Sequence, residues 1–255
     1  MIIIHNSQDP ERRKDQMSNW FYRMKFKYQR FAIPNLAVYV SVCFAVGYML
    51  LSTSVGSSLY LNWLAFTPRE VLHGQIWRIL TAILFPPATG GIFNAVLGIL
   101  IYYSFATSVE KMMGEFEYNV YFFGSILIGE LGAVIYYLIT GTNAPFLPMY
   151  THFAVFMALA IMYADATVLL FFLVPVKIKY IALVEVLMYL YQFVTGGGIY
   201  GPLYTRISII AAFIPVIIFY FATNRHHGGS GNIFKDIKRS IETRKRQKEW
   251  RDQWR

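Results

Sequence analysis

The sequence is poor in charged residues and in cysteine. Only 15% of its 255 residues are charged, whereas 56% are hydrophobic. A soluble domain of this length carries a charge on about a quarter of its residues, so this composition excludes an ordinary soluble globular class. The single cysteine, Cys43, lies inside an apolar run. An intrachain disulfide is therefore excluded, and cysteine usage leaves the redox compartment open.

Other absences narrow the class further. The start MIIIHNSQDPERRK has four apolar residues followed by mixed charge, so we expect no secretory signal peptide. No repeat of fixed period is present, which excludes a solenoid. The chain has no HExxH motif and no Cys/His cluster with metal-ligand spacing. We therefore expect neither a zinc site nor a cofactor.

What the sequence does contain is a series of long apolar runs. A helix needs about 20 apolar residues to cross a bilayer, and several runs approach or exceed this length. They predict an all-α membrane protein with a bundle of six transmembrane helices. The expected spans cover residues 35–52, 91–108, 118–139, 149–164, 178–194 and 203–223.

Two further apolar segments do not fit a span. Residues 53–78 are too apolar for a solvated loop and too interrupted to cross, and they contain Trp and Tyr. Such segments typically lie in the membrane interface, so we expect a half-inserted first loop. The run VLLFFLVP, residues 168–175, is too short to cross, and Pro175 argues against its extending the fourth span. It is interpreted as interfacial or re-entrant.

The positions of the basic residues divide the chain into three segments and predict its orientation in the membrane. They cluster in an N-terminal segment, residues 1–34, and in a C-terminal tail, residues 224–255, on either side of a membrane domain, residues 35–223. Six spans would also place Lys111, Lys177 and Lys179 on the same side as both termini, leaving three of the 23 Lys and Arg residues outside. The positive-inside rule then predicts cytoplasmic termini, in a bacterial plasma membrane as first choice and the endoplasmic reticulum as second.

The basic tails allow two interpretations. Clustered Lys and Arg can bind nucleic-acid phosphates, but they also flank spans routinely, where each attracts anionic lipid by about 1 kcal/mol. We favour the second interpretation: the expected partner is the lipid bilayer, and no nucleic acid is expected.

Four ionisable side chains fall in or near the predicted spans: Glu130, His152, Glu185 and Arg206. A charge at the bilayer centre costs at least about 2.5 kcal/mol, so each needs a partner, water or neutralisation. Glu130 follows Ser125 and Gly129, whose spacing of four gives a small-residue helix face, and we expect Glu130 and Glu185 to point into the bundle. They either form a proton or cation path or are structural groups. His152 is interpreted as interfacial rather than catalytic.

The end of the first loop carries a motif, HGQIWRILT, followed later by a Glu and a Gly. The residues are Gly74, Gln75, Trp77, Arg78 and Thr81, and then Glu110 and Gly114. An interfacial loop ending in GQ-x-WR-x-x-T, then a span and E-x-x-x-G, resembles the rhomboid superfamily. The resemblance covers about residues 35–223 and implies a six-span bundle with both ends inside.

Active rhomboids are intramembrane serine proteases with a Ser–His dyad, and both of their catalytic motifs are absent here. The G-x-S-G serine is missing from PMYTHFAVFMALA, and the A-H-x-x-G histidine from PLYTRISIIAAFIPVIIFYF. The chain is therefore more similar to Derlin-like pseudoproteases, which implies a non-enzymatic binder of transmembrane-helix clients or a remodeller of local lipid. Two alternatives stay open. One is a protease with displaced groups, such as His152 with Ser208. The other is a small ion-coupled transporter that uses Glu130 and Glu185.

The same motif assigns a role to Arg78. By resemblance, Arg78 fixes the half-buried loop onto the bundle, with loop backbone carbonyls or Glu110 as its acceptors. Glu110 falls at the opposite end of the second span from Arg78. We therefore predict that Arg78 binds the loop carbonyls.

Overall fold

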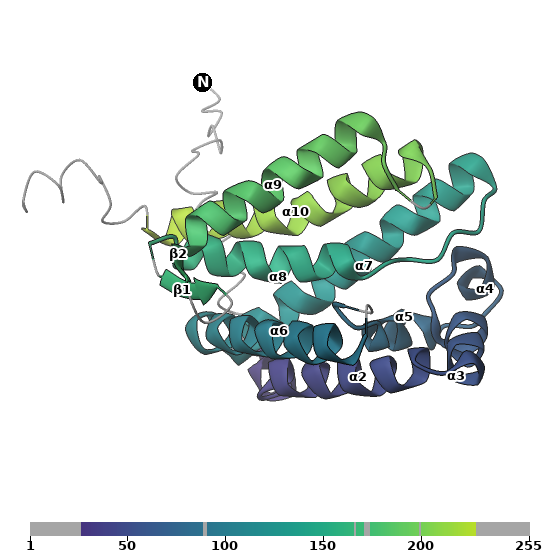
Figure 1. The fold of residues 1–255 in the computed structure, drawn as a ribbon, viewed down its shortest axis with the longest axis horizontal. Coiled ribbons are helices and arrows are strands. Elements are labelled where there is room, and N and C mark those ends of the chain that lie inside the picture. The colour runs from purple at the N-terminus through teal and green to yellow at the C-terminus, as the bar shows by residue number, and fades with distance from the viewer. Residues whose placement is uncertain (1–26, 89–90, 166, 171–173, 199, 228–255) are drawn as a thin grey trace, which may run out of the picture. The chain divides into compact units, whose positions relative to one another are not determined.

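The computed structural model in Figure 1 describes residues 27–88, 91–165, 167–170, 174–198 and 200–227. The chain divides into two compact units, residues 1–216 and 217–255, and the account below concerns the first. Most of the two basic termini lies outside the described residues, so their predicted cytoplasmic location stays a prediction.

The described residues are mostly helical. The apolar runs become helices because their backbone groups have no polar partner in hydrocarbon except one another. The main helices are α2 (Leu36–Leu51), α6 (Ile92–Met113), α7 (Glu115–Thr140), α8 (Met149–Met162), α9 (Ile178–Thr195) and α10 (Pro202–His227). Shorter elements are η1 (Gln29–Phe31), α3 (Ser54–Leu59), η2 (Tyr60–Leu64), α4 (Pro68–Leu72), α5 (Arg78–Thr81) and η3 (Ala82–Leu84).

The long helices alternate in direction and place their connections at two ends. Figure 1 shows the first turn of α2, the α6–α7 turn and the strands β1 and β2 at one end, which we call the hairpin end. The other end, which we call the loop end, carries residues 52–88, the segment 141–148 and the α9–α10 turn. α8 packs against α6, α7 and α9 and so lies in the middle of the bundle.

Five helices in the described part of the chain are long and apolar enough to cross a membrane. As apolar helices of spanning length they match five of the six predicted spans, and the predicted bounds agree with α2, α6, α7, α9 and α10 to within five residues. The sixth, α8, has 14 residues and is about 21 Å long, which is shorter than the apolar core of about 30 Å. The count of six crossings therefore stays a prediction.

The segment that leads into α8 is non-helical and partly buried. Residues 142–148 have no helical structure, and three of them, Ala144, Phe146 and Pro148, are buried. The amide of Phe146 donates to the carbonyl of Phe66 at 2.9 Å. Alternate residues of this non-helical segment are thus buried against the rest of the bundle. In Figure 1 it runs from the end of α7 back to the start of α8.

The run at 168–175 contributes to a short two-stranded hairpin in a fold that is otherwise helical in its described residues. β1 (Thr167–Leu170) and β2 (Val174–Lys177) form an antiparallel pair, with Thr167 opposite Lys177 and Leu170 opposite Val174. A short apolar run is compatible with either a strand or a helix, and here the strand also accommodates Pro175, whose ring removes an amide donor. Within the predicted run, residues 168–170 and 174–175 lie in these strands, and their interpretation as interfacial or re-entrant stays a prediction.

Gly47 allows α2 to lie directly on the backbone of the loop. A Cβ built at Gly47 would overlap the carbonyl oxygen of Leu84 in η3, so no side-chain movement can relieve the contact. We expect Gly47→Ala to lower the free energy of unfolding by about 1–3 kcal/mol, the usual cost of overpacking. Thermal unfolding in detergent measures the effect. Gly124→Ala in α7 is the matched control, since a Cβ there meets nothing within 4 Å. An equally stable Gly47→Ala protein would contradict the packing.

Candidate functional site

The side chain of Arg78 holds the first loop together. It is only 2% exposed, and its guanidinium group donates four hydrogen bonds. Nη1 donates to the carbonyl of Ala65 at 2.7 Å and to Oγ1 of Thr67 at 3.2 Å, and Nη2 donates to the carbonyl of Asn62. Nε donates to Oε1 of Gln75 at 2.7 Å. The prediction that loop carbonyls, rather than Glu110, accept from Arg78 is confirmed.

The neighbouring motif residues act on the same backbone. Thr81 donates through Oγ1 to the carbonyl of Leu64 at 2.7 Å, and the indole of Trp77 donates to the carbonyl of Trp63 at 3.0 Å. Gly74 lies in the turn between α4 and α5. The motif thus binds a stretch, residues 62–67, that begins within the π-helical turn η2, where the normal pattern of backbone hydrogen bonding changes.

A second contact ties this loop to the segment before α8. Asn143 accepts from the amide of Arg69 at 3.1 Å and donates to Oε2 of Glu70 at 2.8 Å. Burial alone raises the pKa of Glu70, but hydrogen bonds from Asn143 and Thr67 and the charge of Arg78 outweigh it, so the pKa lies below its ordinary value. This carboxylate therefore contributes stability above the ordinary pKa of about 4.3, which is lost as the pH falls through the lowered value. Asn143 was not predicted from the sequence.

Glu110 and Gly114 form a separate anchor at the hairpin end. The carboxylate of Glu110 accepts from the amides of Leu36 at 2.7 Å and Ala37 at 3.1 Å, so it caps the start of α2. Gly114 joins α6 to α7 with a φ of 95°, a conformation that favours glycine. Asn119 in α7 reinforces the anchor by exchanging hydrogen bonds of 3.0 Å with the amide and carbonyl of Ile33. The motif residues therefore occupy two structural anchors at opposite ends of the bundle.

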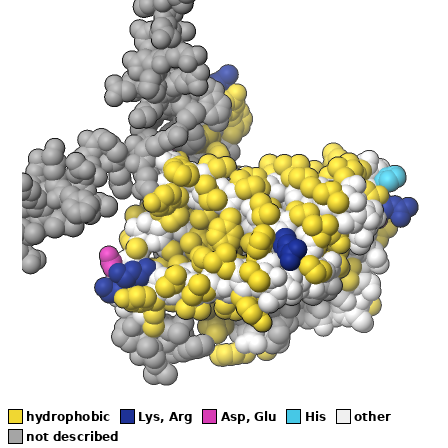
Figure 2. All heavy atoms as spheres, turned by 90° about the horizontal axis from the view of Figure 1, so that it is seen from above, with side chains coloured by type: hydrophobic (Ala, Val, Ile, Leu, Met, Phe, Trp, Pro, Cys, Tyr) yellow, Lys and Arg dark blue, Asp and Glu magenta, His cyan; other side chains and the backbone are white. Residues whose placement is uncertain are grey.

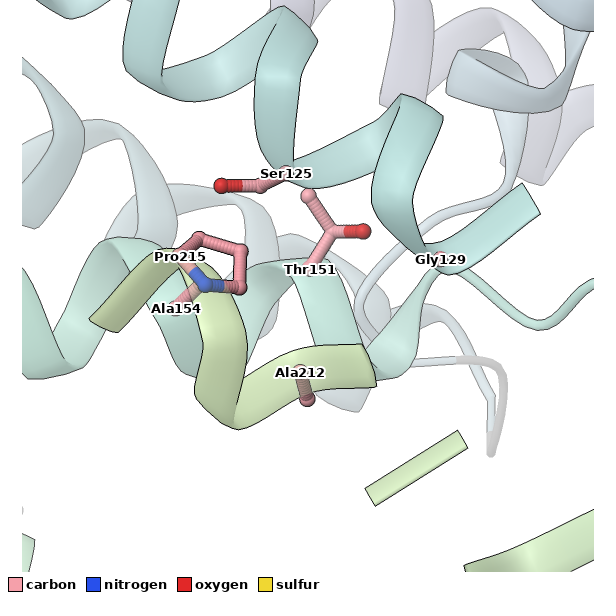
Figure 3. Close-up of a pocket in the computed structure, with 6 residues that line it drawn as sticks. All are labelled: Ser125, Gly129, Thr151, Ala154, Ala212 and Pro215. Carbon is pink, nitrogen blue, oxygen red and sulfur yellow. The ribbon is translucent and has the colours of Figure 1, made fainter. Parts of the chain in front are cut away.

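Glu130 points into the bundle, as predicted. It is 3% exposed, and its Oε1 has no hydrogen-bond partner among the described residues. The adjacent small-residue face, with Ser125 and Gly129, lines a cavity of about 10 Å³, room for about one water molecule. Figure 3 shows its lining residues gathered from α7, α8 and α10: Ser125, Gly129, Thr151, Ala154, Ala212 and Pro215. The space is too small for a substrate.

His152 packs inside the bundle, and its interfacial depth stays a prediction. Its ring nitrogens are buried in the bundle, and neither makes a hydrogen bond of normal geometry to a described residue. The ring makes edge-to-face contacts with Phe44 at 4.9 Å and Tyr102 at 5.4 Å, so it faces α2 and α6. Phe153, the next residue, packs against Phe213 of α10. The structure therefore does not bring His152 together with Ser208, and no hydrogen bond joins them in the described part of the chain.

The remaining predicted residues lie apart. Glu185 is half-buried in α9, and α8 packs between its helix and α7. No hydrogen bond or ion pair within the described ranges links Glu185 to Glu130. Arg206 lies on the exposed side of α10 and donates through Nε to the carbonyl of Phe193 at 3.1 Å. Among the described residues, no group of three or more His, Cys, Asp or Glu is placed to hold a metal ion.

These observations define the class of the chain as a mostly helical, polytopic membrane protein, by the length and composition of its helices. The polar contacts of Arg78 and Glu110 hold the backbone of the fold in place, because most of their hydrogen-bond partners are backbone groups. Comparison with protein-family models, with curated proteins and with solved structures finds no match.

Proposed function

We propose that this chain is a non-enzymatic, rhomboid-like membrane protein that shortens the apolar core of the bilayer beside α9 and binds transmembrane helices of client proteins there. Two features support the proposal. The residues that resemble rhomboids serve as anchors of the scaffold, and the candidate dyad of His152 and Ser208 is not assembled. The observation that carries the proposal is the height of the apolar surface on α9.

Cations lie at two levels along the apolar surface of α9, and one exposed apolar residue of the helix, Val194, lies beyond the second level. Lys179 and Lys177 lie at the hairpin end, where their Nζ atoms contact Oδ1 of Asp165 at 2.7 and 3.5 Å. At the loop end, the guanidinium of Arg206 is held at the level of the Phe193 carbonyl. Lys179 and Phe193 are 14 residues apart, or about 21 Å along a helix.

The surface between these two levels is hydrophobic. Figure 2 shows a face on which hydrophobic side chains predominate and basic side chains are few. The exposed side chains of α9 between the two cation levels are Tyr180, Leu183, Val184, Leu187, Met188, Leu190 and Tyr191. A band of about 21 Å is shorter than an apolar core of about 30 Å. The bilayer becomes locally thinner beside a short apolar band, and snorkelling of the flanking side chains compensates part of the mismatch. The hydrophobic mismatch of a client with a short apolar helix would cost less free energy in this thinner region than in the surrounding bilayer.

The thinning can be measured directly. In lipid nanodiscs of oleoyl phosphatidylcholine, we expect the headgroup density beside α9 to approach the midplane by roughly 5 Å relative to that beside the 22-residue helix α6. Cryo-electron microscopy of the discs measures both distances. Lys179→Leu should extend the apolar band of α9 at the hairpin end and so reduce the thinning beside α9. Lys111→Leu removes an exposed cation from α6 at the same end and should leave the thickness beside α9 unchanged.

Client binding is tested by capture of single-span peptides that differ only in apolar length. Peptides with short apolar segments should be retained more than long ones, and Lys179→Leu should reduce that preference. Uniform bilayer thickness, or capture that is independent of peptide length, would contradict the proposal. Labelling by a fluorophosphonate that disappears in Ser208→Ala would instead support the alternative of a protease.

A further inference from the structure

Arg206 is a cation on an otherwise apolar exterior. It is the fifth residue of α10, which begins at Pro202, and its side chain is exposed. The exposed neighbours one turn away on the same helix are Leu203 and Ile210. On α9, the last turns expose Leu190 and Val194. A charge in this position faces lipid rather than the interior of the bundle.

One of the five N–H groups of Arg206 donates a hydrogen bond to the end of α9. Phe193 lies in the last turn of α9, where carbonyls have no intrahelical donor, and Nε of Arg206 donates to the carbonyl of Phe193 at 3.1 Å. The positive charge is also favourable beside the negative end of the α9 dipole. This bond fixes the guanidinium at the level of the end of α9, and it uses one donor only.

The rest of the guanidinium has no protein acceptor in the described ranges. Phe193 supplies the single acceptor seen for Arg206 there. The ion pairs found among the same residues are those of Asp165 with Lys177 and Lys179, at the opposite end of α9. An uncompensated cation on a lipid-facing surface is costly. A compensating anion must therefore come from outside the described chain.

The depth of Arg206 indicates which anion is available. Tyr191, 70% exposed, lies within one turn of Phe193, and exposed tyrosines are typical of the membrane–water interface. Lipid phosphates lie at this boundary, and the planar guanidinium fork matches their oxygens with two parallel hydrogen bonds.

We propose that Arg206 binds the phosphate of a phospholipid headgroup at the loop end of the α9–α10 face. Nε remains on the carbonyl of Phe193, and the two Nη groups donate to phosphate oxygens. The acyl chains of that lipid then lie along the exposed apolar side chains of α9. The site does not depend on thinning or on client binding, since a phosphate can be held in a bilayer of any thickness.

The test compares lipids with and without phosphate on delipidated protein in detergent. We expect phosphatidylglycerol to raise the midpoint of thermal unfolding more than galactosyl diacylglycerol, which lacks phosphate. In Arg206→Gln the difference between the two lipids should vanish, and the affinity for phosphatidylglycerol, measured by native mass spectrometry, should fall about tenfold. Because the readout is the lipid-dependent increment within each variant, a lower baseline stability does not obscure it.

Two controls make the result specific. Arg206→Lys keeps the charge but loses the planar fork, so its increment should be intermediate, and this variant also serves if Arg206→Gln fails to fold. Arg69→Gln removes another exposed arginine at the loop end and should keep the full increment. An equal loss in Arg69→Gln would mean nonspecific attraction, and stabilisation by inorganic phosphate alone would mean an ion site. Either outcome would overturn the proposal.

Discussion

Arg78→Ala is expected to lower the free energy of unfolding by about 3 kcal/mol or more. The change removes four hydrogen bonds and leaves the carbonyls of Ala65 and Asn62 without their donor. Each buried acceptor that loses its partner costs about 1–3 kcal/mol, and the space vacated by a side chain that is 2% exposed adds a packing loss. Folded yield after detergent extraction and the midpoint of thermal unfolding measure the effect.

Two further variants separate charge from geometry at this position. Arg78→Lys retains a cation, but an ammonium group cannot reproduce the fork that reaches three loop acceptors, so we expect a loss of stability close to that of alanine. Trp77→Phe removes one hydrogen bond from a half-exposed indole and should cost about 1 kcal/mol or less. Normal yield and stability of Arg78→Ala together with lost function would contradict a structural role for Arg78.

The features that could be predicted from the sequence are local in the chain. The lengths of the apolar runs were enough to locate α2, α6, α7, α9 and α10, because in lipid a single segment can form all of its backbone hydrogen bonds only as a helix. The acceptors of Arg78 were also predictable. The three acceptors in the loop, Asn62, Ala65 and Thr67, lie 11–16 residues before it, so the short connection between them limits where the side chain can reach.

The features that could not be predicted depend on long-range packing. Hydropathy does not distinguish a lipid-facing apolar residue from one that contacts another helix, so the position of His152 between Phe44 and Tyr102 left no sequence signal. The short run at 168–175 was ambiguous between helix and strand. Asn119 holds Ile33 from a position 86 residues away, and nothing near Asn119 in the sequence identifies this partner.

Glu110→Ala is expected to destabilise the start of α2 by about 2–4 kcal/mol. The residue at the N-cap of α2, Asn35, has a left-handed conformation with a φ of 53°, and its side chain makes no capping hydrogen bond. The first amides of α2 therefore depend on Glu110, which accepts from Leu36 and Ala37 across 74 and 73 residues of chain. Both amides are buried, and each orphaned donor costs about 1–3 kcal/mol. The negative charge also interacts favourably with the positive end of the helix dipole.

Hydrogen exchange and thermal unfolding together distinguish this mechanism from general damage. In Glu110→Ala, amide protection should fall first at Leu36 and Ala37, while the loop around Arg78, at the other end of α2, keeps its protection. Glu110→Gln retains one acceptor oxygen and should lose about half as much stability. Glu115→Gln is the matched control, since Glu115 is exposed in the first turn of α7 and contributes about 0.3–1 kcal/mol. Unchanged protection at Leu36 in Glu110→Ala would show that α2 begins without the carboxylate, and the anchor at the hairpin end would then depend on Asn119 alone.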